Sequence, residues 1–179
     1  MTSAGEFEVA LSGGHHNSLG NTEAVVEQVR ADISRLEELI DTYASEDEVV
    51  RLRVSSALKR VAKSHPEEFL QHLEVIEQWV LRLRQPSAMW SLSEDYRELD
   101  EKLSPAQRAR AIELMKDFLS SSDDWIVINH TIETLALWAR EDAGLADWLV
   151  PRLWEYSREP RKSIAGKARR HLGVLAQPA

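Results

Sequence analysis

The sequence predicts an all-α fold, a right-handed α-α superhelix of about four helix pairs preceded by an amino-terminal capping helix. Two observations predict it. Apolar residues recur at helical spacing through most of the chain, and proline or short polar turns interrupt that pattern. The second helix of each expected pair also carries an aligned leucine, and successive leucines are 41, 36 and 37 residues apart: Leu58, Leu99, Leu135 and Leu172. A helix pair recurring at this interval is typical of an α-solenoid.

The composition is that of a folded globular protein. Of 179 residues, 43% are hydrophobic and 29% are charged, so the chain can bury a sizeable core. The absence of cysteine excludes a disulfide framework, a zinc-thiolate site and thiol catalysis. The amino terminus has no secretory pattern, and no apolar run is long enough to cross a membrane. We therefore expect a cytoplasmic protein that does not enter a membrane.

The net charge of −8 is unevenly distributed. Residues 1–49 contain eleven acidic and two basic residues, whereas residues 158–179 contain six basic and one acidic residue. Proteins that bind nucleic acid mainly through phosphate contacts usually have a basic surface overall. A nucleic-acid partner is therefore not expected, and the basic final helix is interpreted as a solvated face.

Residues 1–20 are expected to form a flexible amino-terminal tail, and residues 21–179 a single solenoid domain. The tail contains four of the seven glycines and shows no apolar periodicity. Its adjacent histidines, His15 and His16, have no third ligand nearby, so they predict no metal site.

The first expected helix, 22–31, is the capping helix, and Asn21 or Thr22 can cap its amino terminus. Two helices follow, 33–44 and 47–64, and Pro66 ends this pair. The same pattern then predicts three further pairs, separated by Pro86, Ser104-Pro105, Ser120–Ser122, Asp142–Gly144 and Pro160. Their expected ranges are 67–83 with 88–102, 105–119 with 124–141, and 144–157 with 161–176.

The helix expected over 124–141 is the most apolar of the chain. One of its faces carries Trp125, Ile128, Ile132, Leu135 and Ala139, and further apolar residues widen that face. A helix with so little polar surface has neighbours on several sides. We therefore expect it to be the inner helix of a stack.

The second helices of the pairs resemble those of HEAT repeats, which are armadillo-like α-solenoid units. The HEAT pattern opens with Asp-x-x-Val-Arg and continues to small residues and a leucine. The best match is Asp47, Val50 and Arg51, followed by Ser55, Ala57 and Leu58. The stretch from Asp124 to Val127 with Leu135 matches the start but has Ile128 where the pattern has arginine, and Ile164, Ala165, Ala168 and Leu172 match in part. Over residues 33–176 the chain is similar to small bacterial HEAT-like proteins without an assigned activity, which implies the fold but no chemistry.

Candidate catalytic residues are missing from the sequence. The later histidines lie on different expected helices, and no nucleophile sits on a strained turn: His65, His72, His130 and His171. No glycine-rich phosphate loop follows a strand. The sequence therefore favours a protein that is not an enzyme and that has no cofactor and no metal site.

The six tryptophans, at positions 79, 90, 125, 138, 148 and 154, could stack on nucleobases. Helical spacing instead places Trp125, Trp148 and Trp154 among core residues. One HEAT-like family excises alkylated DNA bases with tryptophans and an aspartate, and Trp138 and Asp142 are four residues apart, although Asp142 falls where the helix should end. An alkylated-base DNA glycosylase, or a DNA-binding HEAT-like protein, is therefore the alternative function.

The leading hypothesis is a non-catalytic protein-protein interaction scaffold. In a solenoid the second helices line the concave side, so their polar residues outside the core form the expected groove. Such a mixed, mildly basic groove suits an acidic or amphipathic segment of a partner protein. The predicted partner-binding residues are Arg53, Arg60, Arg97, Asn129, His130 and Arg170.

Overall fold

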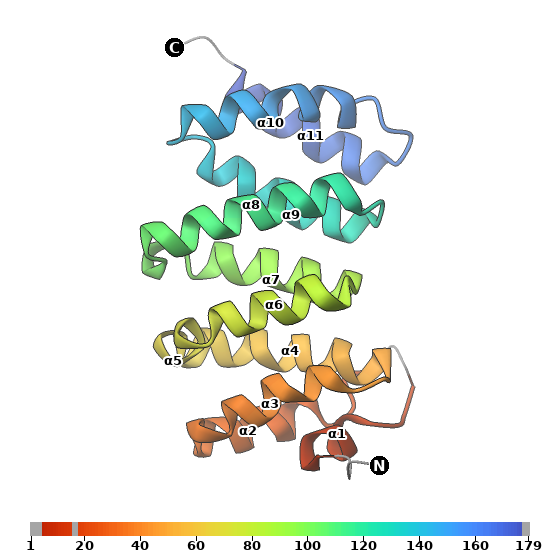
Figure 1. Cartoon of the computed structure of the whole chain (residues 1–179). Helices are drawn as coiled ribbons and strands as arrows, with labels where there is room; N and C mark the ends of the chain where they lie inside the picture. The colour runs from red at the N-terminus through yellow and green to blue at the C-terminus, as the bar shows by residue number, and fades with distance from the viewer. Residues whose placement is uncertain (1–4, 16–17, 177–179) are drawn as a thin grey trace. The chain divides into compact units, whose positions relative to one another are not determined.

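The computed structural model describes residues 5–15 and 18–176, and Figure 1 shows that these residues fold into helices. The described residues contain no strand, which confirms the all-α prediction. The elements are α1 (Glu6–Leu11), α2 (Thr22–Ala31), η1 (Ile33–Arg35), α3 (Leu36–Asp41), η2 (Thr42–Ala44), α4 (Glu48–Ser64), α5 (Pro66–Gln71), α6 (Leu73–Leu83), α7 (Pro86–Glu98), η3 (Asp100–Lys102), α8 (Pro105–Ser121), α9 (Trp125–Trp138), α10 (Ala143–Tyr156) and α11 (Lys162–Leu175), where η marks a 3₁₀ helix.

All nine expected helices are present, with three local differences. The helix expected over 88–102 spans Pro86–Glu98 as α7 and is followed by η3. The helix expected over 67–83 is divided at His72 into α5 and α6, and the ends of the helix expected over 33–44 are wound as η1 and η2. Several helix starts coincide with capping residues that the sequence offers, whereas the expected cap Asn21 makes no side-chain capping hydrogen bond at α2. Asp47 and Asp124 accept hydrogen bonds from backbone N–H groups of the first turn of α4 and α9, and Ser104 forms a capping box at α8.

Helix α1 lies inside the stretch for which the sequence predicts a flexible tail. It buries Phe7 and Leu11, which are four residues apart and therefore share one face. The guanidinium of Arg35 lies 4.2 Å from the centre of the Phe7 ring and pairs with the carboxylate of Glu6 at 3.0 Å. Two apolar residues are too few to show helical periodicity in the sequence, and a glycine-rich run follows them. The sequence therefore does not predict this helix. His16 lies outside the described residues.

The chain divides into two compact units, Met1–Leu103 and Ser104–Ala179, where the sequence predicts one continuous domain. In unit 1, the middle helix is α4, which packs between α2 and α7. Helices α3 and α6 pack against α4 and α7 respectively and form a second layer (Figure 1). In unit 2, α9 contacts α8, α10 and α11, and α10 pairs with α11.

Helix α9 forms the core of unit 2. Ile132 and Leu135 are fully buried, and Ile128 and Ala139 are nearly so. The four aligned leucines of the expected repeat are likewise buried in their own units. The prediction that this apolar helix has neighbours on several sides is therefore confirmed within unit 2.

Polar links between neighbouring helices recur at a nearly constant separation along the chain. In unit 1, Arg51 donates to Gln85 (34 residues apart), Lys59 pairs with Glu94 (35 apart), and Arg60 pairs with Glu23 (37 apart). In unit 2, Lys167 pairs with Glu133 (34 apart), the Tyr156 hydroxyl donates to the Leu119 carbonyl (37 apart), and Arg161 donates to the Asp123 carbonyl (38 apart). These separations, 34 to 38 residues, are close to the 36 to 41 residues between the aligned leucines. Each linked residue therefore meets its counterpart about one helix pair further along the chain.

The α4–α7 interface of unit 1 buries one carboxyl group, that of Asp95. Its Oδ1 atom and the hydroxyl of Ser91, one turn earlier on α7, are buried without a hydrogen-bond partner among the described residues. Burial raises the pKa of Asp95 well above its ordinary value. The charge of Lys59 on α4 opposes this effect, whereas Glu94 adds to it. The packing of α4 on α7 therefore favours the protonated form of this carboxyl.

Replacing Asp95 by asparagine should stabilise the protein at neutral pH. Because the folded chain holds the Asp95 proton more tightly than the unfolded chain, the free energy of unfolding of the wild type falls as pH rises above about 4, until it passes the folded pKa. Asparagine cannot ionise, so Asp95→Asn should raise the melting temperature at pH 7, and the gain should shrink towards pH 3. Thermal unfolding across this range measures the effect. The exposed Asp41→Asn in the same unit is the control, and an Asp95→Asn protein no more stable than wild type at pH 7 would contradict the assignment.

Candidate functional site

The structure distributes the predicted partner-binding residues over both units. Arg53, Arg60 and Arg97 lie on α4 and α7 of unit 1. Asn129, His130 and Arg170 lie on α9 and α11 of unit 2. The two groups therefore belong to different units.

Arg53 is fully buried, which corrects the expectation that it faces outwards. Its guanidinium donates hydrogen bonds to four backbone carbonyl oxygens, those of Leu11 (2.6 Å), Gly13 (2.6 Å), His15 (3.1 Å) and Ser18 (3.0 Å). Gly20 lies against the same guanidinium with φ of +52°, and a Cβ there would come within 3.0 Å of Arg53 Cζ. Helical spacing places Arg53 outside the apolar stripe, but it does not show that the glycine-rich segment folds back over this side chain. Arg53 therefore binds carbonyl groups of its own chain and is not part of a surface that a partner could contact.

The α4–α7 face is the remaining polar surface of the two helices in unit 1, and its residues are Lys59, Arg60, Lys63, Trp90, Glu94, Arg97 and Glu98. Most of its charges are paired across helices. Besides the Lys59–Glu94 pair at 2.9 Å, Lys63 lies 3.5 Å from Glu98, and Arg60 reaches a glutamate of α2 at 2.6 Å. The face is therefore of mixed charge rather than an array of free arginines.

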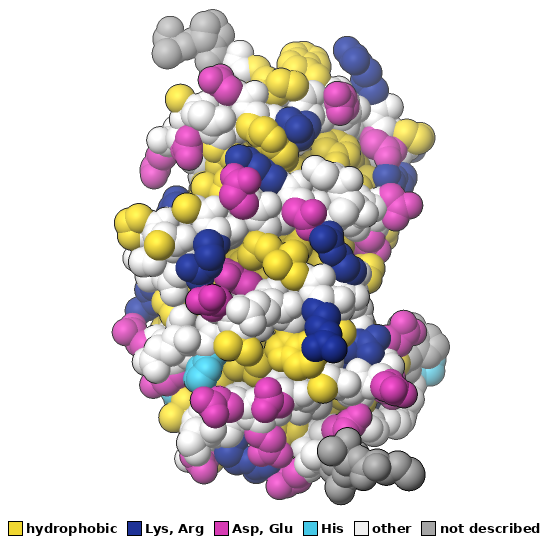
Figure 2. Space-filling model, viewed as in Figure 1, with side chains coloured by type: hydrophobic (Ala, Val, Ile, Leu, Met, Phe, Trp, Pro, Cys, Tyr) yellow, Lys and Arg dark blue, Asp and Glu magenta, His cyan; other side chains and the backbone are white. Residues whose placement is uncertain are grey.

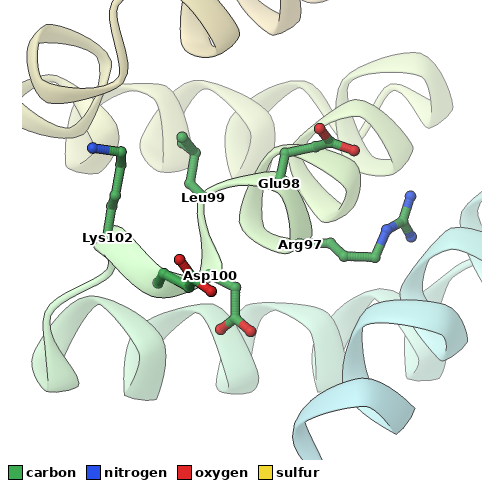
Figure 3. A pocket seen from close by; sticks show the side chains of 6 residues that line it. Arg97, Glu98, Leu99, Asp100 and Lys102 are labelled. Atoms are coloured by element: carbon green, nitrogen blue, oxygen red, sulfur yellow. The ribbon is translucent and has the colours of Figure 1, made fainter.

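A hollow of 270 Å³ lies at the carboxyl-terminal end of α7 and is lined by Arg97, Glu98, Leu99, Asp100, Glu101 and Lys102. Figure 3 shows that the labelled charged side chains point in different directions, so they do not converge on one point. The lining contains charges of both signs. A catalytic pocket requires polar groups that converge on a reacting atom. The hollow is therefore a feature of the surface and not a catalytic site.

In unit 2, one acidic residue lies beside three basic residues of α11. Glu133 on α9 pairs with Lys167, with Arg170 at 2.6 Å and with His171 at 3.6 Å. Burial raises the pKa of Glu133, but the hydrogen bond and charge of Lys167 and the charge of Arg170 more than offset this, so the pKa lies below its ordinary value. Burial lowers the pKa of His171, which Glu133 only partly counteracts. The predicted residue Arg170 therefore faces the surface while paired with Glu133.

The other two predicted residues of unit 2 are less exposed. Asn129 is buried, and its Oδ1 atom has no hydrogen-bond partner among the described residues. His130 is half-buried. Glu133 is the residue that the prediction omitted, although its separation of 34 to 37 residues from Lys167 and Arg170 is a signal that could have found it.

Four of the six tryptophans have a cation of their own chain over the ring. The cation lies 3.8 to 5.4 Å from the ring centre in the pairs Trp79–Arg82, Trp90–Lys59, Trp138–Arg108 and Trp148–Arg152. A cation in this position covers one face of the ring and interacts favourably with it. These rings are therefore less suited to stack on a nucleobase.

Trp125 and Trp154 differ from the expectation that they belong to the core, because each is 51% exposed. Trp125 is the first residue of α9, beyond the packed part of the helix. The buried stripe of α10 contains Leu145, Leu149 and Leu153, so the next residue, Trp154, is turned towards solvent.

The pair suggested for base excision is not formed. Trp138 is buried, and Asp142 is the amino-terminal cap of α10, where its Oδ1 atom accepts a hydrogen bond from the Leu145 N–H at 2.9 Å. Asp142 thus has the capping role that its position at a helix boundary indicates.

A metal site and a membrane span were also sought in the described part of the chain. No group of three or more histidine, aspartate or glutamate side chains there is placed to hold a metal ion. None of the helices that the structure describes has the length and apolar character needed to cross a bilayer. The face seen in Figure 2 shows acidic and basic side chains interspersed with hydrophobic ones, without a large field of one sign.

Comparison with known proteins gives no match, because no protein-family model, no curated protein and no solved structure is significantly similar to the chain.

Replacing Arg53 by methionine should destabilise unit 1. Methionine has a similar length but cannot donate, so four buried or half-buried carbonyl oxygens would lose their partner, and the free energy of unfolding should fall by about 2–4 kcal/mol. The glycine-rich segment should also become sensitive to limited proteolysis. Denaturant unfolding measures the first effect. The control is Arg60→Met on the same helix, whose partly exposed ion pair should contribute about 1 kcal/mol or less. If both variants lost the same free energy of unfolding, the hydrogen bonds of Arg53 would stabilise the protein no more than the ion pair of Arg60, which would contradict the prediction.

Proposed function

We propose that the chain is a non-catalytic protein-protein interaction scaffold, a HEAT-like α-solenoid that binds a segment of a partner protein on its concave face. The observation that carries this proposal is the recurrence of inter-helix links at separations of 34 to 38 residues in each unit. Proteins built of stacked helix pairs have extended surfaces and use them for binding. A cytoplasmic location agrees with the absence of cysteine.

The arginine of the HEAT-like motif supports the repeat assignment. Arg51 donates one hydrogen bond to the Ser45 carbonyl in the turn before its own helix, at 2.7 Å, and another to Gln85 at the start of α7, at 2.6 Å. It thereby joins two successive pairs. In unit 2 the motif has Ile128 in place of arginine, and Arg161 at the start of α11 makes a comparable link to the Asp123 carbonyl.

The α4–α7 face is the partner surface that we propose in unit 1. Trp90 is half-buried there, with the Lys59 ammonium 5.2 Å from the ring centre. Tryptophan and arginine are enriched among residues that dominate binding energies, and charges of both signs select partners by complementarity. Arg60 and Arg97 remain candidate contacts in this face. An acidic or amphipathic segment could exchange its own carboxylates for those that now pair with the basic side chains.

In unit 2 we propose that His130 and Arg170 contribute a second, smaller contact surface. Arg170 is exposed and retains donors beyond those that bind Glu133. Asn129, being buried, would support this surface from beneath.

A grouped charge reversal tests the α4–α7 face. We expect the wild-type protein to retain a specific partner in a pull-down followed by mass spectrometry, and Arg60→Glu, Lys63→Glu and Arg97→Glu combined to reduce retention at least about tenfold. The matched control, Arg82→Glu, Arg84→Glu and Lys102→Glu, changes the net charge equally on other surfaces of unit 1 and should retain the partner.

Two results would contradict the proposal. One is unchanged retention of the partner by a folded face variant, which would place the site elsewhere. The other is release of modified bases from alkylated duplex DNA above a control without protein, which would require the enzymatic alternative.

A further inference from the structure

One end of unit 2 combines features that the proposed function does not use. There α9 begins, α10 ends and α11 begins. The Tyr156 hydroxyl donates to the Leu119 carbonyl at 3.1 Å, and Arg161 donates to the Asp123 carbonyl at 2.5 Å, so these helix ends are held together. We call this surface the α10–α11 end, and its residues are Trp125, Trp154, Arg158, Lys162 and Arg169.

The α10–α11 end carries both half-exposed tryptophans of the chain. Trp125 and Trp154 are each 51% exposed, whereas the other four rings are more buried and covered by a cation. A tryptophan side chain combines a large apolar surface with few rotatable bonds, so it gains much when a partner covers it. Two such side chains at one end of a unit indicate an interaction surface.

The exposed charged side chains of this surface include three basic ones, and the exposed acidic residues beside the tryptophans are Asp123 and Glu155. Arg158, Lys162 and Arg169 are exposed, and in the described residues none of them has an ion-pair partner. Arg169 donates to the Ser157 carbonyl at 2.7 Å, which brings it to the carboxyl-terminal end of α10 beside Arg158. The surface therefore offers three basic side chains without an ion pair, which outnumber the two exposed acidic side chains beside them.

A complementary acidic surface lies on unit 1. Asp32, Glu37 and Asp41 are exposed along η1 and α3, and Glu37 and Asp41 are one turn apart on the same face. No ion pair involves them among the residues that the structure describes. We call these three residues the α3 face. Residues 1–49, which contain it, have eleven acidic and two basic residues.

We propose that the α10–α11 end of one copy binds the α3 face of a second copy of this chain, with its tryptophans covered by that copy. The contact joins two different surfaces, so each copy has one surface of each kind to offer to other copies. The proposal is independent of the α4–α7 face, so either can fail without the other.

Sedimentation velocity over a range of concentrations tests the assembly. Exposed ion pairs are individually weak, so we expect a dissociation constant on the order of 100 μM at low salt. The average mass should grow with concentration above that of the monomer. Raising the salt from about 50 mM to about 500 mM should weaken association at least about tenfold, because exposed charges are screened.

A charge exchange tests the two surfaces. Variant A carries Arg158→Glu and Lys162→Glu, and variant B carries Glu37→Lys and Asp41→Lys. Each variant alone has like charges on both surfaces and should remain monomeric. An equimolar mixture restores opposite charges at every contact and should associate. Trp154→Ala should weaken self-association of the otherwise unchanged protein at least about tenfold, while circular dichroism confirms that each variant is folded.

Three results would overturn the proposal. The first is a wild-type protein that remains monomeric at low salt up to about 1 mM, ten times the expected dissociation constant. The second is association that persists in variant A or B alone. The third is binding of a fluorescent single-stranded oligonucleotide through Trp154 and Arg158 by a protein that does not self-associate, which would assign this surface to nucleic acid.

Discussion

The structure depends on one constraint, that the central helix of each unit can bury its apolar surface only against several neighbouring helices of that unit. The buried stripes of α4 and α9 are broad because each helix has neighbours on several sides. Hydrophobic burial is not directional, so it does not by itself fix which residues meet. The polar links at separations of 34 to 38 residues supply that register, since hydrogen bonds and ion pairs require particular partners.

The same side-chain positions can serve either the fold or a partner. Arg53 and Arg60 are two turns apart on α4, so they point in similar directions. The glycine-rich segment covers the first, and its carbonyl groups satisfy the guanidinium there. The second remains partly exposed and pairs with a glutamate. The glycine-rich segment therefore decides which arginines of α4 are available to a partner, because it covers Arg53 and does not cover Arg60.

Much of the fold follows from the sequence, because helix caps, proline breaks and apolar spacing are local signals. They located all nine expected helices and the buried leucines. What they missed depends on contacts distant in the chain. Helix α1 needs Arg35 beside Phe7, and the burial of Arg53 needs carbonyl groups some 35 to 42 residues away. Of the predicted surface residues, Arg60 and Arg170 are partly exposed but ion-paired. Helical spacing predicts the direction of a side chain, but it does not predict which acidic residue pairs with it.

Site-specific cross-linking tests the order of the helices most directly. The sequence has no cysteine, so introduced pairs can be joined by a short bis-maleimide without background. The account predicts rapid intramolecular cross-linking for Lys59→Cys with Glu94→Cys, which joins α4 to α7, and for Glu23→Cys with Arg60→Cys, which joins α2 to α4. It predicts none for Glu23→Cys with Glu94→Cys, because α4 lies between those two helices. Cross-linking of the third pair as fast as the first two would contradict the sequential stacking of helices in unit 1.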